Sequence, residues 1–486
     1  MTGKVDAIAA AAPFAGAFAF AILLATSLLF ALMLASANWA GAAAILGGVA
    51  GIALMLSGPR ALLAFWLVGS PTFFVFFNNY LHTIPVLTME RVLFATLVLL
   101  VIVRTVWRKL PATRMDVAEK WMLAFLVVGL ALLVPVSMRK PASEFLSRDA
   151  ALYVQAYMMP IGAYMLARRL EWSEREVAQL GVALLIAGVV LSASAMLQVF
   201  AGVTALVPKY MAVIHSEDRA IGVFNNATEF GMVMNALLLL GLLFFVRARD
   251  GLLRATLLVY VAATFAAVIL STTRATWVGL IVSLLVVFMI DKRSRPSLGW
   301  LAASASAVAI AALPLLLESG SLARRVGDVE PILNRIAGAA TALNIVAHNP
   351  LFGVGFERGA FGENMPEYLT GFGGVAGNWA KALGVPHDEH LNVAVLTGLS
   401  GFVPYVAMYV ALFALLRSTR RDSRPDSLAR DLAIYSTAML ASYVTNGLFV
   451  DFGSNIYIGI LMFAAIALAR CLSSHIAGGD AQRRTA

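Results

Sequence analysis

Long apolar runs, repeated from one end of the chain to the other, restrict its fold more than any other feature. A helix needs about 20 apolar residues to cross a bilayer, and we count about fourteen such runs, some of them short. They cover approximately residues 12–35, 39–56, 62–77, 88–106, 121–136, 150–167, 180–200, 230–246, 252–271, 275–290, 299–317, 391–416, 432–450 and 456–472. With 60% apolar and 13% charged residues, the composition lies outside the soluble globular range. We predict an all-α polytopic membrane protein with about 12–14 transmembrane helices, forming one integral membrane domain over residues 1–486.

The positions of the basic residues predict which side of the membrane each loop faces. Lys and Arg collect on the cytoplasmic loops of membrane proteins. Here every strongly basic loop follows an even-numbered run, as Arg168 and Arg169 follow the sixth and Arg420 and Arg421 follow the twelfth. This pattern puts both termini in the cytoplasm and the long stretch 318–389 on the outer face. It also accounts for the net charge of +9, so we expect no nucleic-acid partner.

Two arginines on the outer face are candidates for binding an anion. Arg219 has Glu217 and Asp218 beside it, so a loop ion pair is an equally good interpretation. Arg274 lies between two apolar runs with almost no loop. An arginine in such a place is either an interface anchor or a functional charge that is costly to keep near the membrane. The residues alone leave both alternatives open.

The outer stretch leads into Pro386-His387-Asp388-Glu389-His390-Leu391, where ionisable residues adjoin one another. A histidine in a loop before a helix is most often structural or solvated. Asp388 and Glu389 would orient an imidazole and raise its basicity, which suits a general base near neutral pH. His390 lies one helical turn after His387 and is the alternative base.

A metal site is the competing interpretation of this motif. The two histidines and two carboxylates offer ligand atoms, but no cysteine or second histidine cluster completes a set with the usual spacing. The single cysteine, Cys471, lies in the last apolar run. We therefore expect no metal and no cofactor.

Two arginines and a histidine on one face suit a particular chemistry. Arginine forks match phosphate oxygens bidentately, so they can hold a lipid-linked diphosphate at the interface. A histidine base would deprotonate an acceptor hydroxyl, while the stabilised lipid diphosphate leaves without a separate acid. The set is coherent for glycosyl transfer from a polyprenyl-diphosphate donor.

The chain resembles the bacterial O-antigen ligase and O-antigen polymerase superfamily in four motifs. Arg219-Ala220-Ile221-Gly222-Val223-Phe224-Asn225-Asn226 is similar to the family's Arg-x-x-Gly-x-Phe-x-Asn pattern, and Ser271-Thr272-Thr273-Arg274 to its Ser-x-Ser-Arg turn. His348-Asn349-Pro350-Leu351-Phe352-Gly353-Val354-Gly355 is similar to its long-loop signature. The motif at His387, with Gly398 and Gly401 after it, is similar to His-Asn-x-x-Leu and a glycine-containing helix. Asp388 stands where the family often has Asn, and His390 where an aromatic residue is common.

This resemblance implies a membrane glycosyltransferase of the bacterial inner membrane, with a periplasmic loop at 318–389 that covers a lipid-facing cavity. It implies His387, Arg219 and Arg274 as catalytic residues. It also implies substrate contacts from Arg219, Arg274, His390 and Asp388, and it assigns His348 to packing.

The activity implied is a metal-independent, inverting transfer of a glycan from undecaprenyl diphosphate to an acceptor hydroxyl. In an O-antigen ligase the acceptor is the lipid A-core, which we expect here. In an O-antigen or exopolysaccharide repeat-unit polymerase it is another lipid-linked glycan. A flippase or transporter is the non-enzyme alternative, but that class favours ionisable residues near the midplane. The apolar runs here are nearly free of charge.

Overall fold

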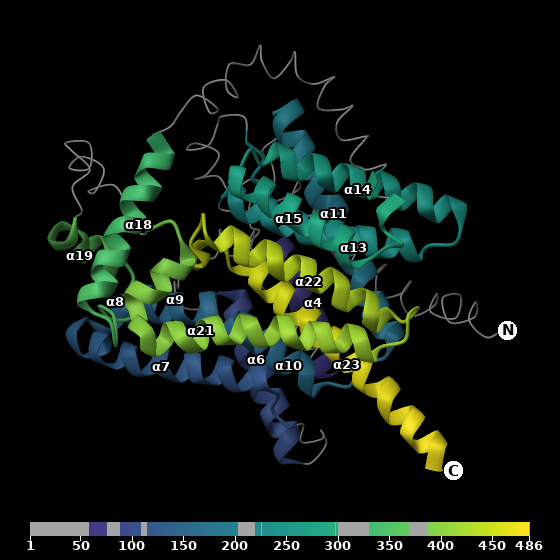
Figure 1. Cartoon of the computed structure of the whole chain (residues 1–486), viewed down its shortest axis with the longest axis horizontal. Helices are drawn as coiled ribbons and strands as arrows, with labels where there is room; N and C mark the ends of the chain where they lie inside the picture. The colour runs from purple at the N-terminus through teal and green to yellow at the C-terminus, as the bar shows by residue number, and fades with distance from the viewer. Residues whose placement is uncertain are drawn as a thin grey trace, which may run out of the picture.

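The computed structural model describes residues 58–74, 88–107, 114–202, 219–224, 226–296, 298–299, 330–369 and 386–485, and all regular elements within these ranges are helices (Figure 1). Seven helical segments in the described ranges are long and apolar enough to cross a membrane. They are α7 (Val117–Arg139), the continuous segment Ala142–Arg169 that ends in α10 (Met159–Arg169), α11 (Glu174–Ala201), α13 (Ala227–Arg247), α14 (Gly251–Leu270), α21 (Glu389–Asp422) and α23 (Ile456–Thr485). The predicted all-α polytopic membrane fold is confirmed.

Further helices coincide with other predicted apolar runs: α4 (Pro59–Gly69) with the π-helical turn η1 (Ser70–Phe74), α6 (Met89–Val106), α15 (Arg274–Ile290) and α22 (Leu428–Gly447). Two helices belong to the outer stretch, α18 (Glu330–His348) and α19 (Ala360–Tyr368). The predicted runs 12–35 and 39–56, and the run 299–317 beyond its first residue, lie outside the described residues.

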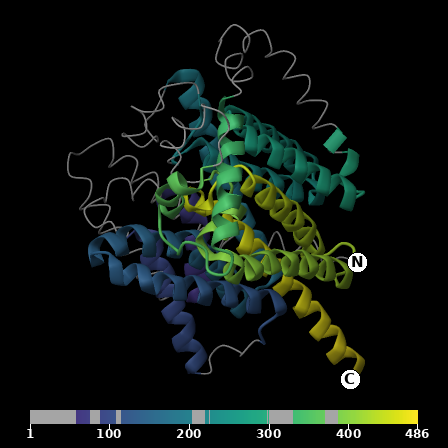
Figure 2. The ribbon, with the colours of Figure 1, turned by 60° about the vertical axis from the view of Figure 1, so that its left-hand side comes forward.

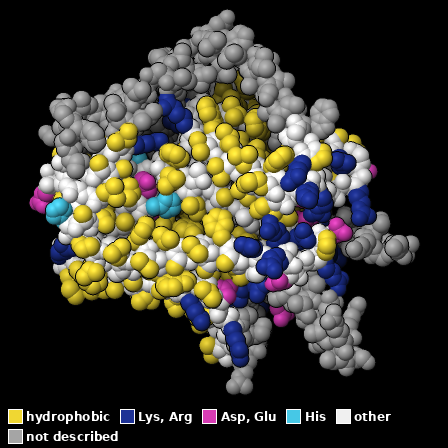
Figure 3. All heavy atoms as spheres, in the orientation of Figure 1, with side chains coloured by type: hydrophobic (Ala, Val, Ile, Leu, Met, Phe, Trp, Pro, Cys, Tyr) yellow, Lys and Arg dark blue, Asp and Glu magenta, His cyan; other side chains and the backbone are white. Residues whose placement is uncertain are grey.

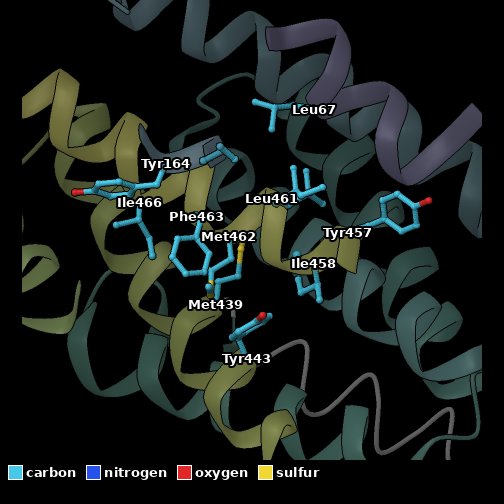
Figure 4. Close-up of a cluster of buried hydrophobic side chains, with 14 of the residues drawn as sticks. Leu67, Tyr164, Met439, Tyr443, Tyr457, Ile458, Leu461, Met462, Phe463 and Ile466 are labelled. Atoms are coloured by element: carbon cyan, nitrogen blue, oxygen red, sulfur yellow. The ribbon is translucent and has the colours of Figure 1, made fainter. Parts of the chain in front are cut away.

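α23 forms the centre of the bundle. In its most apolar window 83% of the residues are buried, against 28% in α7, and it packs against α10 and α22. Figure 4 shows the surrounding apolar side chains, with Tyr457, Ile458, Leu461, Met462, Phe463 and Ile466 from α23, Leu67 from α4, Tyr164 from α10, and Met439 and Tyr443 from α22. Because lipid is as apolar as these side chains, close packing contributes most of what holds such helices together.

α21 is broken at Gly398, whose backbone has φ 57° and ψ −160°. The loop after α18 fills the break. Leu399 N–H donates to the Pro350 carbonyl (2.7 Å), and Val354 N–H donates to the Val395 carbonyl (2.9 Å). A Cβ on Gly353 or Gly398 would meet backbone atoms at 2.2 and 2.5 Å, respectively. Glycine is therefore required at both contacts, which gives a physical reason for glycines in two of the motifs.

Four helices run between two separate clusters of charged and polar residues, one at each end of the bundle. α13, α15, α21 and α22 each have one end near Arg219, Arg274 or His387 and the other end near the basic loops. Figure 3 shows most of the visible Lys and Arg side chains toward the right and the His side chains toward the left. Figure 2 gives a second view of these helices. We call the end with His387 the histidine end and the other the basic end; their assignment to the periplasm and cytoplasm stays a prediction.

Candidate functional site

Arg219 binds the turn that precedes Arg274. Its Nε donates to Thr272 Oγ1 at 3.2 Å, and its Nη2 donates to Thr273 Oγ1 at 2.9 Å. Ala220 N–H donates to the Leu270 carbonyl at 2.9 Å. The structure thus brings the two predicted arginines to one turn. Glu217 and Asp218, the alternative partners of Arg219, lie outside the described residues.

Local chemistry explains why the chain folds this way around Arg219. Gln198, at the end of α11, accepts hydrogen bonds from the backbone N–H groups of Ile221 (3.0 Å) and Gly222 (3.2 Å). It also donates to the Arg219 carbonyl at 2.8 Å. Gly222 has φ +55°, a conformation that glycine adopts readily. Asn226 then caps α13 by accepting from Glu229 N–H at 2.7 Å, as N-cap residues do.

Arg274 is the first residue of α15, and its side chain is exposed. The positive charge of Arg274 acts on that of Arg335, which lies on α18 of the outer stretch, and like charges repel each other. Burial, and then the charge of Arg274, lower the pKa of Arg335. The Arg335 guanidinium lies 5.9 Å from the centroid of the Phe449 ring. No sequence motif indicated Arg335; its only signal was its place in the stretch predicted to cover the site.

His387 lies just before α21 in a left-handed backbone conformation with φ 52°, which is uncommon for a residue other than glycine. Its side chain is exposed. Partial burial lowers its pKa below the ordinary 6.5; Asp451 acts to raise this pKa and Arg335 to lower it. The imidazole is therefore largely neutral at pH 7, as a general base must be.

The residues after His387 have structural roles. Asp388 caps α21 by accepting from Leu391 N–H at 3.0 Å. Glu389, which is fully buried, accepts from Tyr157 OH at 2.6 Å. The expectation that Asp388 or Glu389 orients the imidazole does not match these bonds, and the carboxylate whose charge acts on His387 from another element is Asp451.

His390 points into the bundle. Its Nε2 lies 3.0 Å from the Val444 carbonyl, and its Nδ1 lies 3.2 Å from the hydroxyl of Tyr405. Because a carbonyl only accepts, Nε2 carries the proton and donates to Val444, while Nδ1 accepts from Tyr405. Both ring nitrogens are thus engaged within the protein.

The turn between α22 and α23 carries Phe449 and Asp451, and two buried glutamates fasten it. Glu389 accepts from the backbone N–H of Phe452 at 2.8 Å, and Glu229 accepts from that of Tyr457 at 3.1 Å. Glu389 of the His387 motif therefore holds the turn itself, and Glu229 of α13, the helix that follows the Arg219 motif, holds the start of α23 beside it. No motif in the sequence connected this turn to His387.

Two other predictions concern metal binding and His348. Within the described residues, no group of three or more His, Cys, Asp or Glu side chains is placed to hold a metal ion. His348 is exposed at the end of α18, and its Nδ1 lies 2.9 Å from the Asn344 carbonyl. Metal independence stays a prediction.

Comparison with known proteins adds one family. Residues 258–406 match the family model described as O-Antigen ligase. The matched segment contains Arg274, Arg335, His387 and His390 and excludes Arg219. No curated protein matches the chain. The match confirms the resemblance to the O-antigen ligase and polymerase superfamily.

Proposed function

We propose, from the premise that residues 258–406 are an O-antigen ligase family segment, that this protein is an inner-membrane glycosyltransferase. It moves a glycan from undecaprenyl diphosphate to an acceptor hydroxyl on the periplasmic side. The acceptor we propose is the lipid A-core, as in a ligase; a second lipid-linked glycan, as in a polymerase, is the alternative.

The observation that carries this proposal is the convergence of four segments at the histidine end. Arg219 is hydrogen-bonded to the turn that leads to Arg274, and the charge of Asp451 acts on His387. The arginine guanidiniums suit an anionic leaving group, and a histidine base of lowered pKa suits a hydroxyl nucleophile. This supports a transferase more than a transporter, because none of these residues lies in the middle of a span.

The proposed reaction is a single displacement. Arg274 and Arg219 bind the diphosphate oxygens, and Nε2 or Nδ1 of His387 accepts the proton of the acceptor hydroxyl. The acceptor oxygen forms a bond to the anomeric carbon as the bond to the diphosphate oxygen breaks, and the electron pair leaves with undecaprenyl diphosphate. Attack opposite the leaving group inverts the anomeric configuration, and no covalent enzyme intermediate forms.

We assign the base to His387 rather than His390. Both nitrogens of His390 are used by Val444 and Tyr405, so abstracting a proton would disrupt these partly buried hydrogen bonds. His390 and Asp388 contribute by holding the start of α21, which places His387. Their direct substrate contacts, expected from the resemblance, stay predictions.

Deleting the gene and examining surface glycans tests the proposal. Core lipid without polymer, together with polymer that accumulates on the carrier lipid, is the result expected for a ligase. Core with a single repeat would favour the polymerase, and loss of an exopolysaccharide with normal lipopolysaccharide would point to a polymerase of another pathway. Unchanged surface glycans and carrier lipids would overturn both versions.

A further inference from the structure

α18 brings a third arginine to the histidine end. Arg335 is half-buried, its guanidinium lies 5.9 Å from the centre of the Phe449 ring, and its charge acts on His387. The charge of Arg274 also acts on Arg335. Three segments that are far apart in the chain, α15, α18 and the turn after α22, therefore meet at this guanidinium.

Two neighbouring guanidiniums repel each other, and such an arrangement is stabilised by an anion between them. In the part of the chain that the structure describes, no carboxylate lies within 4.0 Å of Arg274 or Arg335. The aromatic ring of Phe449 orients Arg335 by a cation–π contact without neutralising its charge. A ligand with several anionic oxygens would satisfy both arginines.

We propose that Arg335 binds the diphosphate of the lipid-linked donor together with Arg274. This inference rests on the proposed function and extends it, since it adds a diphosphate-binding residue from the outer stretch. Arg335 would neutralise charge that builds up on the leaving diphosphate, next to the base that receives the acceptor proton.

The scaffold around α18 is suited to this role. Ala342 and Ile345 of α18 pack in a buried cluster with Phe361, Met365 and Val395, and Val395 belongs to α21, the helix that begins after His387. The same residue accepts the hydrogen bond of Val354. α18, which carries Arg335, therefore packs against α21, which begins just after His387, so a diphosphate bound by Arg335 would lie on the same side of the molecule as the base.

A direct measurement of lipid binding separates diphosphate binding by Arg335 from an effect on catalysis. The full chain, purified in nanodiscs, would be titrated with undecaprenyl diphosphate and with undecaprenyl monophosphate, neither carrying a glycan. Arg335→Gln removes the charge and the fork. Arg358→Gln is the matched control, because Arg358 is an exposed arginine of the same stretch whose backbone N–H, not its side chain, binds Asp149 at 2.7 Å.

We expect Arg335→Gln to weaken diphosphate binding about ten- to hundredfold, the loss typical of a charge-assisted contact, and to weaken monophosphate binding less. Arg358→Gln should change neither affinity by more than about twofold. Arg335→Lys should recover part of the loss, since it restores charge but not the fork. Phe449→Leu should produce a smaller loss than Arg335→Gln because it removes only the platform.

Different failures have different meanings. If wild-type protein binds undecaprenyl diphosphate and Arg335→Gln binds it equally well, the inference is overturned and the proposed function stands. Equal weakening of both lipids by Arg335→Gln, with a lowered melting temperature, would make Arg335 a structural residue and also overturn it. If the wild-type protein binds neither lipid, the proposed function fails and the inference fails with it.

Discussion

The two polar ends of the bundle hold their arginines in different ways. At the basic end each arginine of the ion-pair network has a carboxylate partner. Arg247 binds Asp431 at 2.6 Å, and Arg168 binds Asp116 at 2.7 Å. Arg293 also pairs with Asp431. These contacts tie neighbouring helices together where their loops leave the bundle.

At the histidine end the arginines meet other kinds of group. Arg219 donates to threonine hydroxyls, Arg335 lies over an aromatic ring, and Arg274 adjoins Arg335. Lys140, at the same end, forms ion pairs with Asp149 at 3.2 Å and Glu357 at 2.5 Å. Asp149 and Glu357 are therefore directed to Lys140 and not to these arginines. The two ends therefore use positive charge differently. At the basic end, ion pairs join neighbouring helices, whereas at the histidine end positive charge collects near His387.

Substitution of the proposed base, His387, is the strongest test of this contrast. We expect His387→Ala to lower the transfer rate by about 10²- to 10⁴-fold, the range for loss of a general acid–base group. Its side chain is exposed, so the protein should insert and melt as the wild type does. Product formation in proteoliposomes containing lipid-linked donor and acceptor measures the effect.

His348→Ala is the control for that experiment, since His348 is also an exposed histidine of the outer stretch. It should retain transfer within about a factor of three, as surface substitutions usually have small effects. Full activity of His387→Ala would overturn the base assignment. Loss of activity in His348→Ala alone would move the site toward the end of α18.

The second test asks whether the arginines bind in a bidentate way. Arg274→Lys keeps the charge and loses the fork, so we expect transfer to fall about ten- to hundredfold. Arg148→Lys is the comparison, because Arg148 is exposed at the same end and pairs with Glu144 at 3.1 Å, which lysine can also do. Wild-type turnover of Arg274→Lys would identify Arg274 as an interface anchor.

Much of the fold could be predicted from hydropathy, since a bilayer requires long apolar helices and hydropathy measures that directly. The predicted runs 88–106 and 275–290 coincide closely with α6 and α15. The break at Gly398 could not be predicted, because it depends on the loop around Gly353 fitting against α21. The two glycines are far apart in the sequence and come into contact only when the loop packs against α21.

The candidate site could be predicted in part for a similar reason. Arg219, Arg274 and His387 belong to recognisable motifs, and the predicted topology put them on one face of the membrane. Arg335 and Asp451 have no motif, and their relation to His387 comes from how α18 and the last turn pack. The reason for proposing His387 over His390 as the base could not be predicted either, because the contacts of His390 with Val444 and Tyr405 are tertiary contacts.

A smaller effect is expected in the pH profile. His387 acts as a base only when neutral, so transfer falls as pH drops through its pKa, which lies below 6.5. Asp451 raises this pKa and Arg335 lowers it. Asp451→Asn should therefore move the acid limb of kcat/KM to lower pH, and Arg335→Gln should move it to higher pH. Shifts in the same direction, or no shift in either variant, would contradict the charge arrangement around His387.

The smallest effect on transfer is expected at the basic end. Arg247→Gln removes the ion pair with Asp431, but Arg293 continues to bind that carboxylate, so Asp431 keeps a cationic partner. Partly exposed ion pairs contribute about 1 kcal/mol or less, and we expect a slightly lower melting temperature in nanodiscs. Transfer per folded molecule should equal that of the wild type, because charge at this end serves helix association. A large loss of transfer with an unchanged melting temperature would show that the basic end takes part in the reaction, and the distinction between the two ends would be wrong.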